Sequence, residues 1–168
     1  LIPNYFTKPA VFLDRDGVIN YDKGYTYKIE DFKFRPGVVK AIKHLNLKNY
    51  YVFIVTNQAG IAKGFFTIGD FFKLQKYIKN ILIKKNIFIN DVKFSPYHPE
   101  GKIKKYSIKS NFRKPGNLMI ESLFTEWNLI RKKSLMIGDK ITDMKAAKKS
   151  NIKFLYVEKN LLKQVKKI

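Results

Sequence analysis

Short apolar runs alternate with amphipathic stretches along this chain of 168 residues. The apolar runs predict strands at Ala10–Asp14, Tyr51–Thr56, Val92–Ser95, Leu135–Gly138 and Phe154–Val157. Apolar residues at helical spacing predict helices at Val38–Asn46, Gly69–Lys85, Asn117–Trp127 and Asp143–Lys149. Thr67 and Thr142 are expected to cap the second and the fourth of these helices. The alternation predicts one α/β domain over residues 1–168, with a Rossmann-like parallel sheet sandwiched by helices.

Two connections are long for a compact domain. They are Asn20–Phe34, directly after the first strand, and Pro96–Lys114, which is rich in lysine. Loops of this length usually serve a functional site.

The composition restricts the class of protein. Hydrophobic residues make up 45% of the chain, which is typical of a globular protein. No apolar run approaches the roughly 20 residues of a membrane helix, and Leu1–Asn4 lack the pattern of a signal peptide. The absence of cysteine excludes disulfides and zinc sites built on thiolates. We expect a cytoplasmic monomer that binds no membrane.

The formal net charge of +21 favours anionic partners. Nearly all of the basic excess is lysine, because the only arginines are Arg15, Arg35, Arg113 and Arg131. Lysine is less suited than arginine to bidentate recognition of bases and phosphates. We therefore expect a solvated lysine surface that speeds the approach of a small anionic substrate, and no nucleic-acid partner.

Acidic residues directly follow two of the predicted strands. Asp14 ends the first strand and Asp16 follows it into a glycine turn, and Asp139 and Asp143 follow the fourth. In open α/β sheets the ligand crevice lies outside the carboxyl ends of the strands. Two acids there repel each other unless a cation offsets them. An Asp-rich turn, and a helix N-terminus that favours Asp143, are the simpler interpretations of each segment by itself.

Two further segments supply donors and cations. Thr56-Asn57-Gln58 ends the second strand, and Arg113-Lys114 precedes a predicted helix, where a phosphate fits. Each segment alone is also consistent with an ordinary polar or basic turn. Together with the carboxylates, however, they suit magnesium-assisted phosphoryl transfer.

The charges predict a role for each group. We expect Asp14 to attack phosphorus and form an aspartyl-phosphate. Asp16 would protonate the leaving alkoxide and then deprotonate the hydrolytic water. Thr56 and Lys114 would hold the equatorial phosphoryl oxygens, and Asp139 would complete the metal shell.

These four segments, in this order, resemble the haloacid dehalogenase superfamily, whose signatures are Asp-x-Asp-Gly, Thr-Asn, a later Lys and Gly-Asp-x(3)-Asp. The finer pattern resembles its family of heptose-1,7-bisphosphate 7-phosphatases. The segments that carry this likeness are Phe12–Asn20, Asp22–Tyr25, Thr56–Gly64, Tyr97–Pro99, Arg113–Pro115 and Gly138–Lys140. The resemblance implies removal of the 7-phosphate during nucleotide-activated heptose biosynthesis, for lipopolysaccharide or capsule, by a fold without a large cap domain.

The same resemblance implies further roles. Magnesium would be held by the side chains of Asp14 and Asp139 and by the main chain of Asp16. Arg113 would recognise the distal phosphate of the sugar, and Lys140 would lie beside the metal-bound group. The substrate site would be lined by Asp22, Lys23, Gly24, Tyr25, Thr56, Asn57, Gln58 and Ala59.

One departure concerns a zinc site. The family commonly holds zinc in the third loop on a Cys-x-His pair and a Cys-x-Cys pair, and these positions read Ser95-Pro96-Tyr97 and Ser110-Asn111-Phe112 here. Serine and phenylalanine do not make a zinc site. We expect no zinc, with Tyr97 and Phe112 packing the loop instead.

Three other functions stay open. Histidinol-phosphate phosphatases share the four signatures, although Asp22–Tyr25 and Gly60–Gly64 favour the heptose family. Polynucleotide 3′-phosphatases share the core, but stacking platforms for nucleotides are not evident. A non-catalytic binding protein would retain the acid pair without using it. The preferred anomer is not predicted.

Overall fold

The computed structural model describes residues 6–168, so Leu1–Asn4 lie outside the described part of the chain. Five parallel strands form one sheet in the order β3-β2-β1-β4-β5. Their bounds are β1 Ala10–Leu13, β2 Tyr51–Asn57, β3 Asp91–Ser95, β4 Leu135–Gly138 and β5 Lys153–Tyr156. The predicted α/β fold with a parallel sheet is confirmed, and no predicted strand end differs from the observed one by more than one residue.

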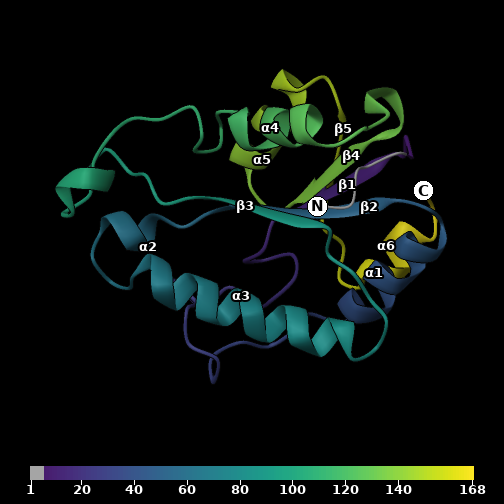
Figure 1. Cartoon of the computed structure of the whole chain (residues 1–168), viewed down its shortest axis with the longest axis horizontal. Helices are drawn as coiled ribbons and strands as arrows, with labels where there is room; N and C mark the ends of the chain where they lie inside the picture. The colour runs from purple at the N-terminus through teal and green to yellow at the C-terminus, as the bar shows by residue number, and fades with distance from the viewer. Residues whose placement is uncertain (1–5) are drawn as a thin grey trace.

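Helices cover both faces of the sheet (Figure 1). One face carries α1 (Val38–Leu47), α3 (Ile68–Ile83) and α6 (Leu161–Val165), and the other carries α4 (Leu118–Glu126) and α5 (Ile141–Lys149). Val11 and Leu13 of β1 point into the first core, and Ala10 and Phe12 point into the second. Since side chains alternate along a strand, a strand buried on both faces is apolar throughout.

The register of the sheet aligns the carboxyl ends of β1, β2 and β4 at one edge. Leu13, the last residue of β1, pairs with Ile54 of β2 and with Ile137 of β4. The residues that follow these positions therefore emerge together at the carboxyl edge. β1 lies at the switch point of the strand order, because the chain adds β2 and β3 on one side of it and β4 and β5 on the other. In open α/β sheets, ligands bind at this point of the carboxyl edge.

Of the two predicted helix caps, the structure confirms Thr67 and contradicts Thr142. The Thr67 hydroxyl accepts a hydrogen bond from Asp70 N, and the Asp70 carboxylate accepts one from Thr67 N, so the predicted cap of α3 is confirmed. The prediction for Thr142 is wrong. Because α5 begins at Ile141, Thr142 lies inside the first turn, and the Asp143 carboxylate accepts the backbone N–H groups of Asp139 and Lys140 instead.

Four short helical segments were not predicted. They are α2 (Ala59–Ala62), α6 and the 3₁₀ turns Lys104–Tyr106 and Arg131–Lys133. Segments of three to five residues are too short to show helical periodicity. Within residues 6–168, no helix has the length and apolar character needed to cross a membrane.

Candidate active site

A cavity of about 440 Å³ opens at the carboxyl ends of β1, β2 and β4. It brings together most of the predicted site residues, which come from segments far apart in the sequence. Those that line it are Asp14, Asp16, Asp22, Gly24, Tyr25, Thr56, Asn57, Gln58, Ala59, Arg113, Lys114 and Lys140. Of the other predicted residues, Asp139 lies beside Asp14, while Lys23 is exposed and outside the lining. Thr142 and Asp143 line the cavity in addition.

Lys114 lies at the centre of the charge network. Its ammonium is 3.0 Å from an Asp14 carboxylate oxygen and 2.7 Å from an Asp143 oxygen, and it donates to the Val55 carbonyl at 2.8 Å. All three charged side chains are buried. A buried lysine is stable only with such partners, so the two carboxylates fix its position as well as its charge.

Burial dominates the ionisation of Asp14. It raises the pKa of Asp14 to about 7, against the attraction of Lys114 and with further repulsion from Asp143 and Asp16. Burial also lowers the pKa of Lys114, but Asp14 and Asp143 outweigh it and the net pKa is raised. The lysine alone therefore does not compensate the negative charge around Asp14. A bound cation would compensate the remaining negative charge.

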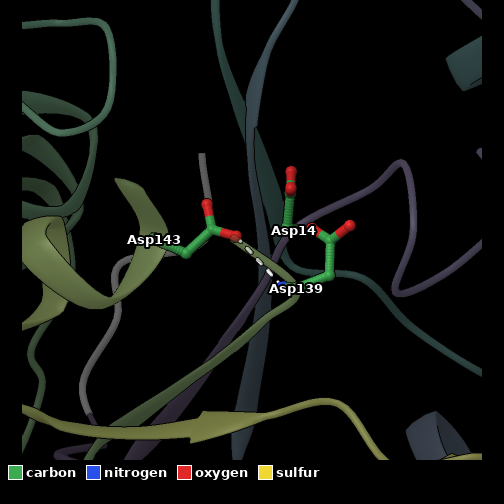
Figure 2. Close-up of side chains that lie close together, drawn as sticks. All are labelled: Asp14, Asp139 and Asp143. Atoms are coloured by element: carbon green, nitrogen blue, oxygen red, sulfur yellow. Dashed lines mark hydrogen bonds between the residues drawn. The ribbon is translucent and has the colours of Figure 1, made fainter. Parts of the chain in front are cut away.

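Three carboxylates offer ligands for such a cation. Asp14, Asp139 and Asp143 each place one oxygen so that all three oxygens lie within 4.8 Å of one another (Figure 2). Asp143 is already engaged by Lys114 and by the N-terminus of α5. Asp139 is not: its Oδ1 is buried without a hydrogen-bond partner, and burial raises its pKa. A hard divalent cation with oxygen ligands fits this donor set.

Gly17 makes room for the Asp139 carboxylate. A Cβ at Gly17 would lie 2.2 Å from Asp139 Oδ2, and the residue has a φ of +90°. Only glycine satisfies both the left-handed backbone and the close approach.

Asp16 is held apart from the other carboxylates. It accepts hydrogen bonds from the Arg15 guanidinium at 3.0–3.2 Å, from Asn20 Nδ2 at 2.9 Å and from Gln58 Nε2 at 2.9 Å. Gln58 also donates to the Thr56 hydroxyl at 2.9 Å. The side chain of Asp16 therefore has a fixed place at the wall of the cavity.

Two residues have roles that the sequence pattern did not predict. Asn57 uses its side-chain amide on the backbone of Lys114, in two hydrogen bonds of 2.9 and 3.0 Å, and thereby ties the third loop to β2. Arg15 is fully buried and also donates to the carbonyl of Thr26 in the first loop. A charged residue between two aspartates at the end of a buried strand was the only signal for Arg15.

The mouth of the cavity is basic. The Lys140 ammonium lies 3.4 Å from the Asp22 carboxylate. Burial lowers the pKa of Lys140, but the charges of Asp139, Asp22 and Asp14 outweigh burial, so the net pKa is raised. Arg113 is partly buried, and this burial lowers its pKa. These cations suit an anionic substrate.

At the zinc-ligand positions of the third loop, side chains pack or form local hydrogen bonds. The Tyr97 ring lies 6.3 Å from that of Tyr106, and Phe112 packs against the core under α4 and α5. Ser95 is buried, and the Ser110 hydroxyl accepts the N–H of Phe112.

The chain is similar to known enzymes over most of its length. A family model for haloacid dehalogenase-like hydrolases matches residues 104–157. The D-glycero-beta-D-manno-heptose-1,7-bisphosphate 7-phosphatase of Rhodopseudomonas palustris is 42% identical over 145 residues, which cover 86% of this chain and 81% of that protein. The D-glycero-alpha-D-manno-heptose-1,7-bisphosphate 7-phosphatase of Burkholderia mallei is 39% identical and covers 85% and 76%.

A solved structure shares the fold. The D,D-heptose 1,7-bisphosphate phosphatase of B. bronchiseptica, complexed with magnesium and phosphate, matches 95% of this chain and 86% of its own with a TM-score of 0.80 and 21% identity. The chain is thus a haloacid dehalogenase-like hydrolase that acts as a phosphoric monoester hydrolase. Within that class it belongs to the family of the D-glycero-D-manno-heptose-1,7-bisphosphate 7-phosphatases.

Proposed function

We propose that this enzyme removes the 7-phosphate of D-glycero-D-manno-heptose 1,7-bisphosphate, with magnesium and through an aspartyl-phosphate. The contact of Asp14 with Lys114 at the base of a basic cavity is the observation that carries the proposal. Because the two groups lie 3.0 Å apart, this contact supports a role for Asp14 as the nucleophile and for Lys114 as the cation that binds the same phosphate. The names of the relatives support the substrate.

In the first step an Asp14 oxygen attacks phosphorus, and the bond from phosphorus to the sugar oxygen breaks. Asp16 gives its proton to that oxygen as it leaves. Lys114 and the Thr56 hydroxyl hold the phosphoryl oxygens while charge moves across them. Arg15, Asn20 and Gln58 keep the acid in place for this transfer.

In the second step Asp16 takes a proton from water, and the resulting hydroxide attacks the phosphorus of the aspartyl-phosphate. Inorganic phosphate leaves, and the Asp14 carboxylate is restored. The metal would be held by the side chains of Asp14 and Asp139 and the main chain of Asp16. Magnesium, when bound, reduces the repulsion between the anionic nucleophile and the anionic phosphate.

Release of phosphate from several esters tests the substrate. The two anomers of heptose 1,7-bisphosphate are compared with histidinol phosphate and a 3′-phosphorylated DNA. We expect either bisphosphate to exceed the other two esters by about 10²-fold in kcat/KM, since a second phosphate adds charge-assisted hydrogen bonds. A higher kcat/KM for histidinol phosphate or DNA would overturn the proposed substrate. Relatives named for both anomers match this chain at nearly equal identity, so the assay also decides the anomer.

A further inference from the structure

Lys114 is buried at a point of the chain that has no regular structure. It lies between β3 and α4, outside any helix or strand, and is only 2% exposed. Buried backbone N–H and C=O groups need hydrogen-bond partners, and a residue outside a helix or a sheet cannot find them in a regular ladder. The backbone of Lys114 must therefore be bound by another part of the chain.

The side chain of Asn57 supplies both partners. Its Nδ2 donates to the Lys114 carbonyl at 2.9 Å, and its Oδ1 accepts the Lys114 N–H at 3.0 Å. These two bonds hold the backbone on both sides of the Lys114 Cα, from which the lysine side chain starts. Although Asn57 lines the cavity, both ends of its amide are thus engaged by Lys114.

The other end of the lysine returns to the same strand. Lys114 Nζ donates to the carbonyl of Val55, two residues before Asn57 in β2, at 2.8 Å. Between these two residues lies Thr56, whose hydroxyl is the second group proposed to hold the phosphoryl oxygens. The carboxyl end of β2 therefore carries one phosphate-binding group and holds both ends of the other.

We propose that Asn57 is a positioning residue, which sets the place of the Lys114 ammonium relative to the Thr56 hydroxyl and does not bind the substrate through its side chain. This role differs from the substrate contact that the resemblance implies for Asn57. Both phosphate-binding groups act only if they are correctly placed, and a displacement of about 1 Å can lower the rate about 10²-fold. The inference rests on the proposed function, which gives Lys114 and Thr56 their roles.

A second asparagine provides a matched control. Asn46 of α1 forms the same pair of bonds with a single distant residue: its Nδ2 donates to the Phe88 carbonyl at 3.0 Å, and its Oδ1 accepts the Phe88 N–H at 2.8 Å. Both asparagines are half-buried, but Asn46 does not line the cavity. Asn46→Ala therefore removes equivalent hydrogen bonds away from the site.

The test measures kcat and KM of Asn57→Ala and Asn46→Ala on heptose 1,7-bisphosphate and on p-nitrophenyl phosphate. We expect Asn57→Ala to lower kcat about 10- to 10²-fold by the same factor on both esters, with KM within about threefold of wild type. Asn46→Ala should keep kcat within about twofold, and the loss of Tm should be similar in the two variants. A raised KM with kcat retained would make Asn57 a substrate contact and overturn the inference. An equal loss of kcat in both variants would overturn it too.

A double-mutant cycle shows whether Asn57 acts through the lysine. Asn57→Ala is combined with Lys114→Met, and single turnovers are followed with enzyme in excess. We expect the asparagine substitution to add less than about twofold once the lysine is lost, and full additivity would refute the positioning role. If Lys114→Met alone keeps the kcat of wild type, the role of Lys114 in the proposed function fails instead. Loss of activity in Lys114→Met with unchanged kcat in Asn57→Ala refutes the positioning role alone.

Discussion

Asp14 combines two properties that oppose each other at the level of a single residue. It needs a negative charge to act as a nucleophile, yet burial and the neighbouring carboxylates Asp143 and Asp16 disfavour that charge. Lys114 offsets part of the repulsion through its 3.0 Å contact. We therefore expect Asp14 to react only when a bound cation compensates the rest of the repulsion.

Asp14→Asn removes the proposed nucleophile while keeping the shape of the side chain. We expect kcat to fall by at least about 10³-fold, as it does when a covalent nucleophile is lost. Phosphate release at saturating substrate measures the effect, and circular dichroism checks that the fold is retained. Activity within about tenfold of wild type would contradict the assignment.

Asp14→Asn is expected to lower activity but to raise the stability of the metal-free protein. The ordinary pKa of Asp14 is 3.8 and the folded pKa is about 7, so the folded state keeps a proton that the unfolded chain releases between these values. The contribution of Asp14 to stability is complete below pH 3.8 and is lost as pH rises to about 7. Above that range the ionised group destabilises the metal-free protein.

We therefore expect Asp14→Asn to gain stability relative to wild type as pH rises. Thermal unfolding in EDTA, between about pH 4 and pH 8, measures the difference in Tm. The difference in Tm should grow as pH rises to about 7 and level off above that value. A difference that does not depend on pH would show that the pKa of Asp14 is not raised in the folded protein.

At the level of elements, the turn after β1 brings two strand ends together. Gly17 follows the strand end of β1, and Asp139 follows β4; the close approach of the two residues depends on the absence of a Cβ. A bulky residue in this turn would push the Asp139 carboxylate away from Asp14. The turn thus controls the spacing of the two proposed metal ligands, Asp14 and Asp139.

Gly17→Ala tests this spacing. We expect the magnesium concentration for half-maximal activity to rise about tenfold or more, since displaced ligand groups usually weaken binding to that extent. Gly64→Ala is the matched control, because Gly64 also has a positive φ, of +76°, but its Cβ would meet only Ile103 at ordinary distances. An equal loss of magnesium affinity in both variants would attribute the effect to backbone strain instead.

At the level of the whole molecule, the sheet and most of the cavity could be predicted from the sequence. A strand such as β1 is apolar throughout because helices cover both faces, so its pattern is unambiguous. Parallel strands also bring their carboxyl ends to one edge. This geometry places Asp14, Thr56 and Asp139 near one another without any knowledge of the side-chain contacts.

The remaining features depend on contacts between distant residues. Asn57 binds the backbone of Lys114, which is 57 positions away, and Arg15 contacts Gln58, which is 43 positions away. No local pattern encodes such partners. The cap of α5 was predicted at Thr142 because the local signal favours a hydroxyl, but the helix begins at Ile141 and the Asp143 carboxylate accepts the N–H groups of Asp139 and Lys140.

The proposed reaction is a magnesium-dependent attack by Asp14 on the phosphate at position 7. Phosphorus NMR of heptose 1,7-bisphosphate during turnover tests it most directly, with magnesium, with EDTA and with Asp14→Asn. We expect the 7-phosphate signal to be replaced by that of inorganic phosphate while the 1-phosphate signal persists, and only for the wild-type enzyme with magnesium. Loss of the 1-phosphate, or turnover in EDTA or by Asp14→Asn, would contradict it.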